Sequence, residues 1–177
     1  MTTQQILLMD CLYLVFLGAV IYFTHAATRR IVGALAGGAA AGLLALGMIA
    51  VGEAQGWWRL PSGSTPYFRL QLYIGLAISM TPPFLIIWRV VRRFGWRGLA
   101  VFLGAVAVIG PPRDYLIAAM FPEWMVFAPG VAPVLADAAT YVCMVALGYA
   151  AMRLVAGPAR DRLAGRSWEA VGKRTSA

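Results

Sequence analysis

The sequence carries little charge for its length. Only 12% of its 177 residues are charged, 61% are hydrophobic, and the mean hydropathy is +0.75. A soluble globular domain has about a quarter of its residues charged, so this balance excludes one. It also excludes a disordered chain, which would be polar and poor in aromatic residues. We therefore expect an integral membrane protein.

Residues that could bind a metal are also scarce. The chain has one histidine and two cysteines, Cys11 and Cys143, which both lie in apolar runs without the C-x-x-C spacing of a zinc site or a redox dithiol. It has neither a GxxxxGK[ST] phosphate-binding loop nor a GxSxG nucleophile motif. We therefore expect no metal site and no cofactor, and we interpret the cysteines as packing residues.

Long apolar runs are what the sequence has in abundance. A helix needs about 20 mostly apolar residues to cross a bilayer. Five runs fit this requirement, the fourth only with tilt or local thinning of the bilayer: 6–23, 31–51, 70–88, 98–110 and 134–155. The sequence thus predicts an all-α polytopic membrane protein. Its bundle of five transmembrane helices would occupy residues 1–157, and a basic cytoplasmic tail would occupy residues 158–177.

Prolines interrupt the apolar pattern in two places. Pro111 and Pro112 should end the fourth span, and the apolar stretch that follows is broken by further prolines. We expect that stretch, at about 115–131, to be a re-entrant or interfacial helical segment between the fourth and fifth helices. In the third span, Pro82 and Pro83 predict a kink near mid-membrane.

Basic residues fall almost entirely on one side of this five-span arrangement. Arg59, Arg69 and Arg113 lie on the side of the N-terminus, and every other Lys and Arg lies on the opposite side. The positive-inside rule therefore places the N-terminus outside and the C-terminus inside. In a bacterium this is the inner (plasma) membrane. The net charge of +8 then indicates contact with membrane lipids, above all by the basic tail, and no nucleic-acid site.

The second apolar run has small residues four apart, a spacing that stacks them on one helix face. Gly33, Gly37, Gly38 and Gly42 belong to this pattern. Such a face lets other backbones approach closely. We interpret it as close packing inside one chain and not as the seam of a homodimer.

The acidic residues lie mostly on the outer side, and two of them lie at membrane depth. Asp10 and Asp137 each sit about one helical turn below the outer boundary. An ionisable group at that depth costs several kcal/mol unless it is paired or hydrated, and it therefore suggests a functional site. We expect an outward-facing polar pocket with these ligand-binding residues: Asp10, Arg69, Arg113, Asp114, Glu123, Asp137 and Tyr141.

The same residues have a purely structural interpretation, in which they cap helices, pair with each other or reach to the interface. We favour that interpretation for Glu53 and Arg59. For Asp137, and for Arg113 with Asp114, both interpretations stay open.

Three functions are compatible with such a pocket. The first is the binding of a lipophilic small molecule, or service as an accessory subunit to a membrane-protein partner. The second is an intramembrane enzyme acting on a lipid or isoprenoid, in which Asp137, Glu123 or Asp10 would supply acid and base catalysis. The third is part of an oligomeric transporter, because buried acids and a proline-broken helix are common transporter parts.

Overall fold

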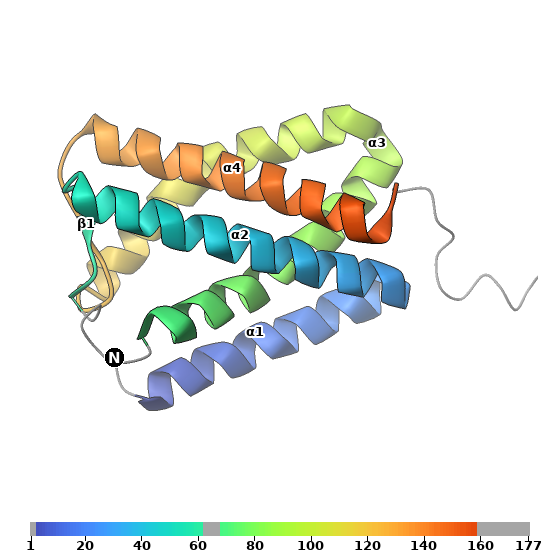
Figure 1. The fold of residues 1–177 in the computed structure, drawn as a ribbon, viewed down its shortest axis with the longest axis horizontal. Helices are drawn as coiled ribbons and strands as arrows, with labels where there is room; N and C mark the ends of the chain where they lie inside the picture. The colour runs from blue at the N-terminus through green and yellow to red at the C-terminus, as the bar shows by residue number, and fades with distance from the viewer. Residues whose placement is uncertain (1–2, 62–67, 159–177) are drawn as a thin grey trace, which may run out of the picture.

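The computed structural model describes residues 3–61 and 68–158, which form a helical bundle closed at one end by a small β-ribbon (Figure 1). The helices are α1 (Thr3–Thr24), α2 (Thr28–Ala54), α3 (Phe68–Met120) and α4 (Val131–Ala156). The strands β1 (Trp58–Arg59) and β2 (Val126–Phe127) pair antiparallel, with Trp58 opposite Phe127 and Arg59 opposite Val126.

Three of the helices, α2, α3 and α4, are long and apolar enough to cross a membrane. The apolar stretch of α1 among the described residues, Cys11–Thr24, is shorter. The chain is thus all-helical apart from the ribbon, as the apolar runs predict, and it has the composition of a membrane-embedded bundle.

Helix α3 contains both the third and the fourth expected spans, so residues 3–61 and 68–158 form four helices where the sequence predicts five. Gly95, with φ 63° and ψ −149°, is the point inside α3 where the backbone leaves helical geometry. In Figure 1 the green and yellow parts of α3 run in opposite directions along the bundle from a bend at the end away from the β-ribbon. The polar stretch between the two spans is rich in arginine, a good helix former, so the helix breaks only at the glycine.

The prolines at the expected end of the fourth span do not end α3, which corrects that expectation. Backbone geometry is helical at Pro82 and Pro83, and the helix also continues through Pro111 and Pro112 to Met120. Membrane helices tolerate proline because neighbouring groups satisfy the freed carbonyls. The expectation of a helical segment at 115–131 is wrong for residues 121–130. Its first residues belong to α3, and the rest is a non-helical connection that includes β2.

The small residues of α2 pack against two other helices, which confirms the interpretation as close packing inside the chain. Gly33 and Gly37 face α4, and a Cβ on Gly37 would lie 2.6 Å from the carbonyl oxygen of Gly148. Gly38 and Gly42 face α3 near Ala77. Every one of these positions is fully buried, so α2 is the central helix of the bundle.

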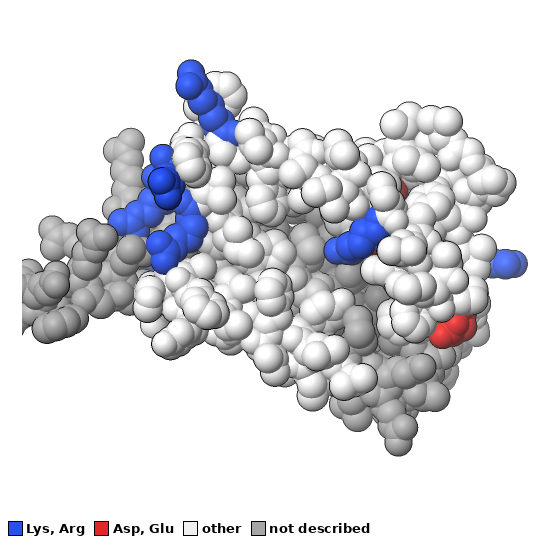
Figure 2. Space-filling view, turned by 180° about the vertical axis from the view of Figure 1, so that it is seen from behind, with Lys and Arg blue, Asp and Glu red and all other residues white. Residues whose placement is uncertain are grey.

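Most arginines of the described residues gather at the end of the bundle opposite the β-ribbon, as Figure 2 shows. Arg30 at the start of α2 donates to the carbonyl oxygens of Gly157, at 2.9 Å, and Pro158, just past the end of α4. Arg89 donates to the carbonyl oxygen of Phe23 at 3.3 Å, which ties α3 to the end of α1. The segments that the charge rule places inside thus meet at one end of the molecule.

Close packing at Gly37 gives a direct test of the bundle. Gly37→Ala forces the α2 and α4 backbones apart, so we expect a loss of about 1–3 kcal/mol in the free energy of unfolding. Gly47→Ala is the matched control in the same helix, because a Cβ at Gly47 meets nothing within 4 Å. The control should gain up to about 1 kcal/mol from helix propensity. Titration from mild detergent into SDS measures both, and equal unfolding midpoints would contradict the packing.

Candidate functional site

A polar network joins α3 to α4 at the level of Arg113. Asp114 Oδ1 accepts from Nε and Nη2 of Arg113, at 3.0 and 2.8 Å. Tyr141 on α4 donates its hydroxyl to Asp114 Oδ2 at 2.7 Å and accepts from Arg113 Nη2 at 2.6 Å. The guanidinium also lies over the Tyr141 ring, 5.5 Å from its centroid. These three side chains form a closed ring of charge-assisted hydrogen bonds.

A glycine on α3 makes room for this network. Gly110 lies one helical turn before Asp114, and a Cβ there would overlap the ring of Tyr141. The ring therefore lies close to the α3 backbone at Gly110, and its hydroxyl reaches the Asp114 carboxylate. Because position 110 has no side chain, the tyrosine can lie between the two helices.

Asp137 lies one helical turn from Tyr141 on α4 and is only 7% exposed. Its Oδ2 atom is buried without a hydrogen-bond partner among the described residues, and so is the hydroxyl of Tyr115 on α3. The two side chains lie within electrostatic range of each other, and Asp137 is also within range of Asp114 and Arg113. We name Arg113, Asp114, Tyr115, Asp137 and Tyr141 the α3/α4 polar cluster.

Aromatic residues connect this cluster to the β-ribbon. Tyr115 stacks on Phe127, with ring centroids 4.3 Å apart, and Phe127 meets Trp58 edge-on at 5.8 Å. Trp58 is 5% exposed, packs against Gly52 and donates its indole N–H to the carbonyl oxygen of Ile49 at 3.1 Å. The ribbon is therefore fixed to the end of α2 and covers the end of the cluster.

The other expected site residues lie elsewhere or outside what the structure describes. Arg69 pairs with Glu53 of α2, at 3.6 Å between Nη2 and Oε2. Glu123 is exposed in the connection between α3 and β2. Asp10 belongs to α1, but its side chain lies outside the described residues, as does the basic tail from residue 159. The structure thus brings together Arg113, Asp114, Asp137 and Tyr141 and places Arg69 in a separate ion pair.

Sequence reasoning missed the buried state of Arg30. Its side chain is 2% exposed, and its guanidinium lies 5.5 Å from the centroid of the Trp88 ring. A signal was present, because Arg30, Gly33 and Gly37 share one face of α2 by helical spacing, and that face is the packed one. Tyr115 had no such signal, since its role depends on contact with β2.

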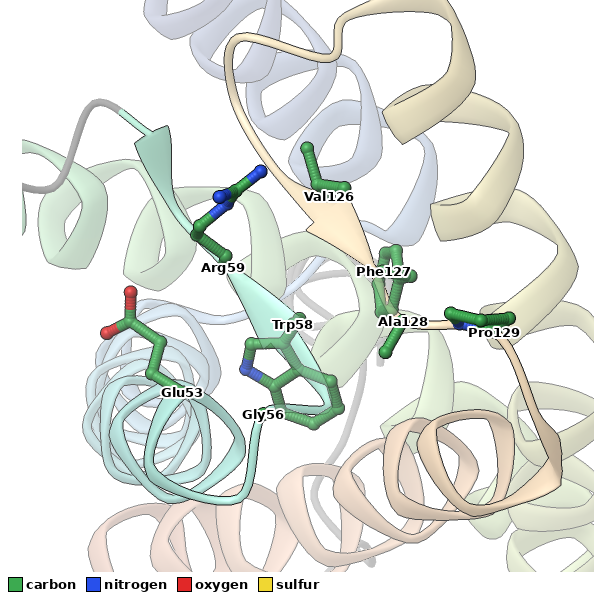
Figure 3. A pocket seen from close by; sticks show the side chains of 8 residues that line it. All are labelled: Glu53, Gly56, Trp58, Arg59, Val126, Phe127, Ala128 and Pro129. Carbon is green, nitrogen blue, oxygen red and sulfur yellow. The ribbon is translucent and has the colours of Figure 1, made fainter.

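Two cavities lie beside the β-ribbon. The larger, of about 640 Å³, is lined by residues from the end of α2 and from both strands with their flanks: Glu53, Gly56, Trp58, Arg59, Val126, Phe127, Ala128 and Pro129 (Figure 3). The smaller, of about 120 Å³, is lined by Leu46, Ile49, Ala50, Glu53, Leu60, Phe68, Arg69 and Leu72. Glu53 borders both cavities. Among the described residues, no three His, Cys, Asp or Glu side chains lie together as a metal site would need.

Comparison of the chain with protein-family models, with curated proteins and with solved structures finds no match. The geometry of the described residues is therefore the basis for the functional argument.

The hydroxyl of Tyr141 should stabilise the bundle measurably. Tyr141→Phe removes one bond to a carboxylate and one to a guanidinium, so we expect a loss of about 1–3 kcal/mol in the free energy of unfolding. Tyr22→Phe is the control, because Tyr22 is 72% exposed on α1 and its change should be within about 0.5 kcal/mol of zero. Unfolding in SDS measures both, and a Tyr141→Phe midpoint equal to that of Tyr22→Phe would show that the ring does not hold the helices together.

Proposed function

We propose that this chain is a multi-pass membrane protein that binds a lipophilic small molecule at the α3/α4 polar cluster. The observation that carries the proposal is Asp137, a carboxyl group buried on a membrane-type helix with one oxygen unpartnered among the described residues. Buried polar atoms are almost always hydrogen-bonded, so an exception of this kind marks a place where a ligand or a water completes the structure. Acids at membrane depth are functional by default.

The surroundings of Asp137 favour an amphiphile over a soluble metabolite. The Tyr115 hydroxyl offers a second polar atom without a partner among the described residues, and the cluster joins two helices that are apolar enough to cross a membrane. A single oxygen of a ligand could bond to both atoms while its hydrocarbon part contacts the helices. Arg113 is 59% exposed and adds a positive charge at the edge of the cluster, where an anionic or carbonyl group of the ligand could reach it.

The proposal includes five membrane crossings, with the N-terminus outside and the C-terminus inside. Each half of α3, on either side of Gly95, has roughly 25 residues and is long enough to cross a hydrocarbon core of about 30 Å. The ends that meet near Gly95 carry the arginine cluster, and the β-ribbon end carries most of the acids among the described residues. In a bacterium, the protein would lie in the inner membrane with the ribbon facing the periplasm.

Labelling of single cysteines tests this orientation. In a background without Cys11 and Cys143, a membrane-impermeant maleimide added to intact cells should label Gln55→Cys and Pro122→Cys but not Trp96→Cys, which are all exposed positions. The Pro122 position decides the number of crossings, because it shares a side with Gln55 only if α3 crosses twice. Labelling of Trp96→Cys from outside, or protection of Pro122→Cys, would contradict the five-crossing arrangement.

Catalysis on a lipid is the second candidate, and one observation favours it. Asp114 and Asp137 belong to the same cluster and interact electrostatically, so one carboxyl group could donate a proton while the other accepts one. An enzyme would convert a lipid in a membrane extract, and the conversion would stop in both Asp114→Asn and Asp137→Asn. A binding protein would show no change in lipid mass.

Mass spectrometry of the protein in native lipid particles tests ligand binding. The wild type should carry a lipophilic molecule at a fixed ratio, and Asp137→Asn should retain about tenfold less of it, because the amide replaces one acceptor by a donor. Thr140→Val is the matched control one turn away, since the Thr140 hydroxyl already bonds to the Ala136 carbonyl. Equal retention in both variants would contradict the proposal, and a protein partner retained in both would favour an accessory subunit.

A further inference from the structure

The cavity between the end of α2 and the β-ribbon has the size and the chemistry of a binding site of its own. Its volume of about 640 Å³ falls in the range of small-ligand pockets. In Figure 3 the lining residue Trp58 lies between Glu53 and Arg59 on one side and Phe127, Ala128 and Pro129 on the other. The cavity thus offers an aromatic wall and two charges of opposite sign.

The aromatic side chains that line this cavity are held in place by their neighbours. Trp58 is held by its bond to Ile49 and by close contact with Gly52, and Phe127 is held between Trp58 and Tyr115. The Glu53 carboxylate is fixed by the backbone N–H of Leu60, which donates to Oε1 at 3.3 Å. A ligand would therefore meet a prepared surface and would not need to order these side chains.

The charges around the cavity suit a ligand that carries both signs. Arg59 is exposed at the cavity, and Arg69 pairs with the far oxygen of Glu53 while its own side chain remains 71% exposed. An ion pair so exposed to water contributes little to stability. Arg69 can therefore share Glu53 with a cationic group of the ligand. An anionic group would bond to the arginines and an N–H donor would bond to Glu53.

The smaller cavity extends this site into an apolar crevice between α2 and the start of α3. Apart from Glu53 and Arg69 at its edge, it is lined by Leu46, Ile49, Ala50, Leu60, Phe68 and Leu72. Because Glu53 borders both cavities, a ligand whose polar part fills the large cavity could place a hydrocarbon chain in the crevice. Tryptophans in this position are typical of the headgroup level of a membrane.

We propose that the two cavities together bind a phospholipid with a primary ammonium headgroup. The phosphate bonds to Arg59 and Arg69, the ammonium donates to the Glu53 carboxylate at the border of the two cavities, and one acyl chain lies in the crevice between α2 and α3. This site involves none of the residues of the α3/α4 polar cluster except through the Tyr115 to Phe127 contact, and it does not depend on the ligand proposed there.

Native mass spectrometry of the delipidated full-length chain tests the site, using phosphatidylethanolamine, phosphatidylcholine and phosphatidylglycerol with identical acyl chains. The wild type should retain phosphatidylethanolamine about tenfold better than the other two, because the quaternary ammonium has no N–H to donate and glycerol has no charge. Glu53→Gln should remove this preference. Arg59→Gln should lower retention of all three about tenfold, whereas Arg92→Gln, an exposed arginine near the bend of α3, should change nothing.

Soluble glycerophosphoethanolamine distinguishes a lipid from its headgroup alone. If the acyl chain occupies the crevice, a large excess of the soluble compound should displace little lipid. Displacement at equal concentration would show a site for a soluble phosphodiester and would overturn the assignment to a lipid. Equal retention of the three lipids by the wild type, or wild-type retention by Arg59→Gln, would also overturn it.

Two controls separate this result from other failures. Arg59 and Glu53 lie at the surface end of the bundle, so both variants should unfold at the wild-type midpoint in SDS, and a lowered midpoint would point to misfolding as the cause of lost lipid. Asp137→Asn should keep full phosphatidylethanolamine binding. Loss of binding in that variant would show that the two sites are one and would overturn the separate site.

Discussion

Direct contact between helix backbones is the constraint on which the structure depends. In a bilayer, burial of apolar side chains gives no advantage over lipid, so helices associate through close packing and hydrogen bonds. Here α2 presents glycines to α4 on one side and to α3 on the other, and the partner surfaces are themselves backbone atoms or small residues such as Gly148 and Ala77. Phe84, which is fully buried, fills the space beside Gly37 and Gly148 and links all three helices. A larger side chain at any of these contacts would separate the helices and with them the residues of both proposed sites.

Glycines also allow close contact next to hydrogen-bonded polar groups. Gly110 allows the Tyr141 ring to lie against the α3 backbone, and Gly52 does the same for Trp58 at the end of α2. In each case an aromatic side chain with a polar tip is placed by a missing side chain on the facing helix. The Tyr141 hydroxyl then donates to Asp114, and the Trp58 indole N–H donates to the Ile49 carbonyl. Helix packing and polar geometry are therefore set together, and neither site could be moved without repacking the bundle.

Much of this could be predicted from the sequence, because the decisive signals are local. Apolar runs give the helices, the four-residue spacing of glycines gives the packed face of α2, and the arginines give the two ends. The errors arose where an outcome depends on distant contacts. Pro111 and Pro112 predict a helix end. Helix α3 continues past them because its backbone is supported by packing against α4. Residues 58–59 and 126–127 show no periodic pattern, so the sequence does not predict that they pair. The contact of Tyr115 with β2 depends on this pairing and could not be predicted either. Arg69 pairs with Glu53 of α2, a contact between distant segments that the sequence pattern does not predict, and its ligand-binding role stays a prediction.

The distribution of polar groups differs between the two ends of the bundle. At the arginine-rich end, Arg30 of α2 bonds to the carbonyl oxygens of Gly157 and Pro158 just past α4, where the helix dipole also favours a cation, and its guanidinium lies against Trp88 of α3. Breaking these contacts would remove the link between the start of α2, α3 and the end of α4. At the β-ribbon end lie both cavities, and Tyr115, whose hydroxyl is unpartnered among the described residues, stacks on Phe127 of β2. The stacked rings of Phe127 and Tyr115 connect the two sites, because Phe127 lines the larger cavity and Tyr115 belongs to the α3/α4 polar cluster.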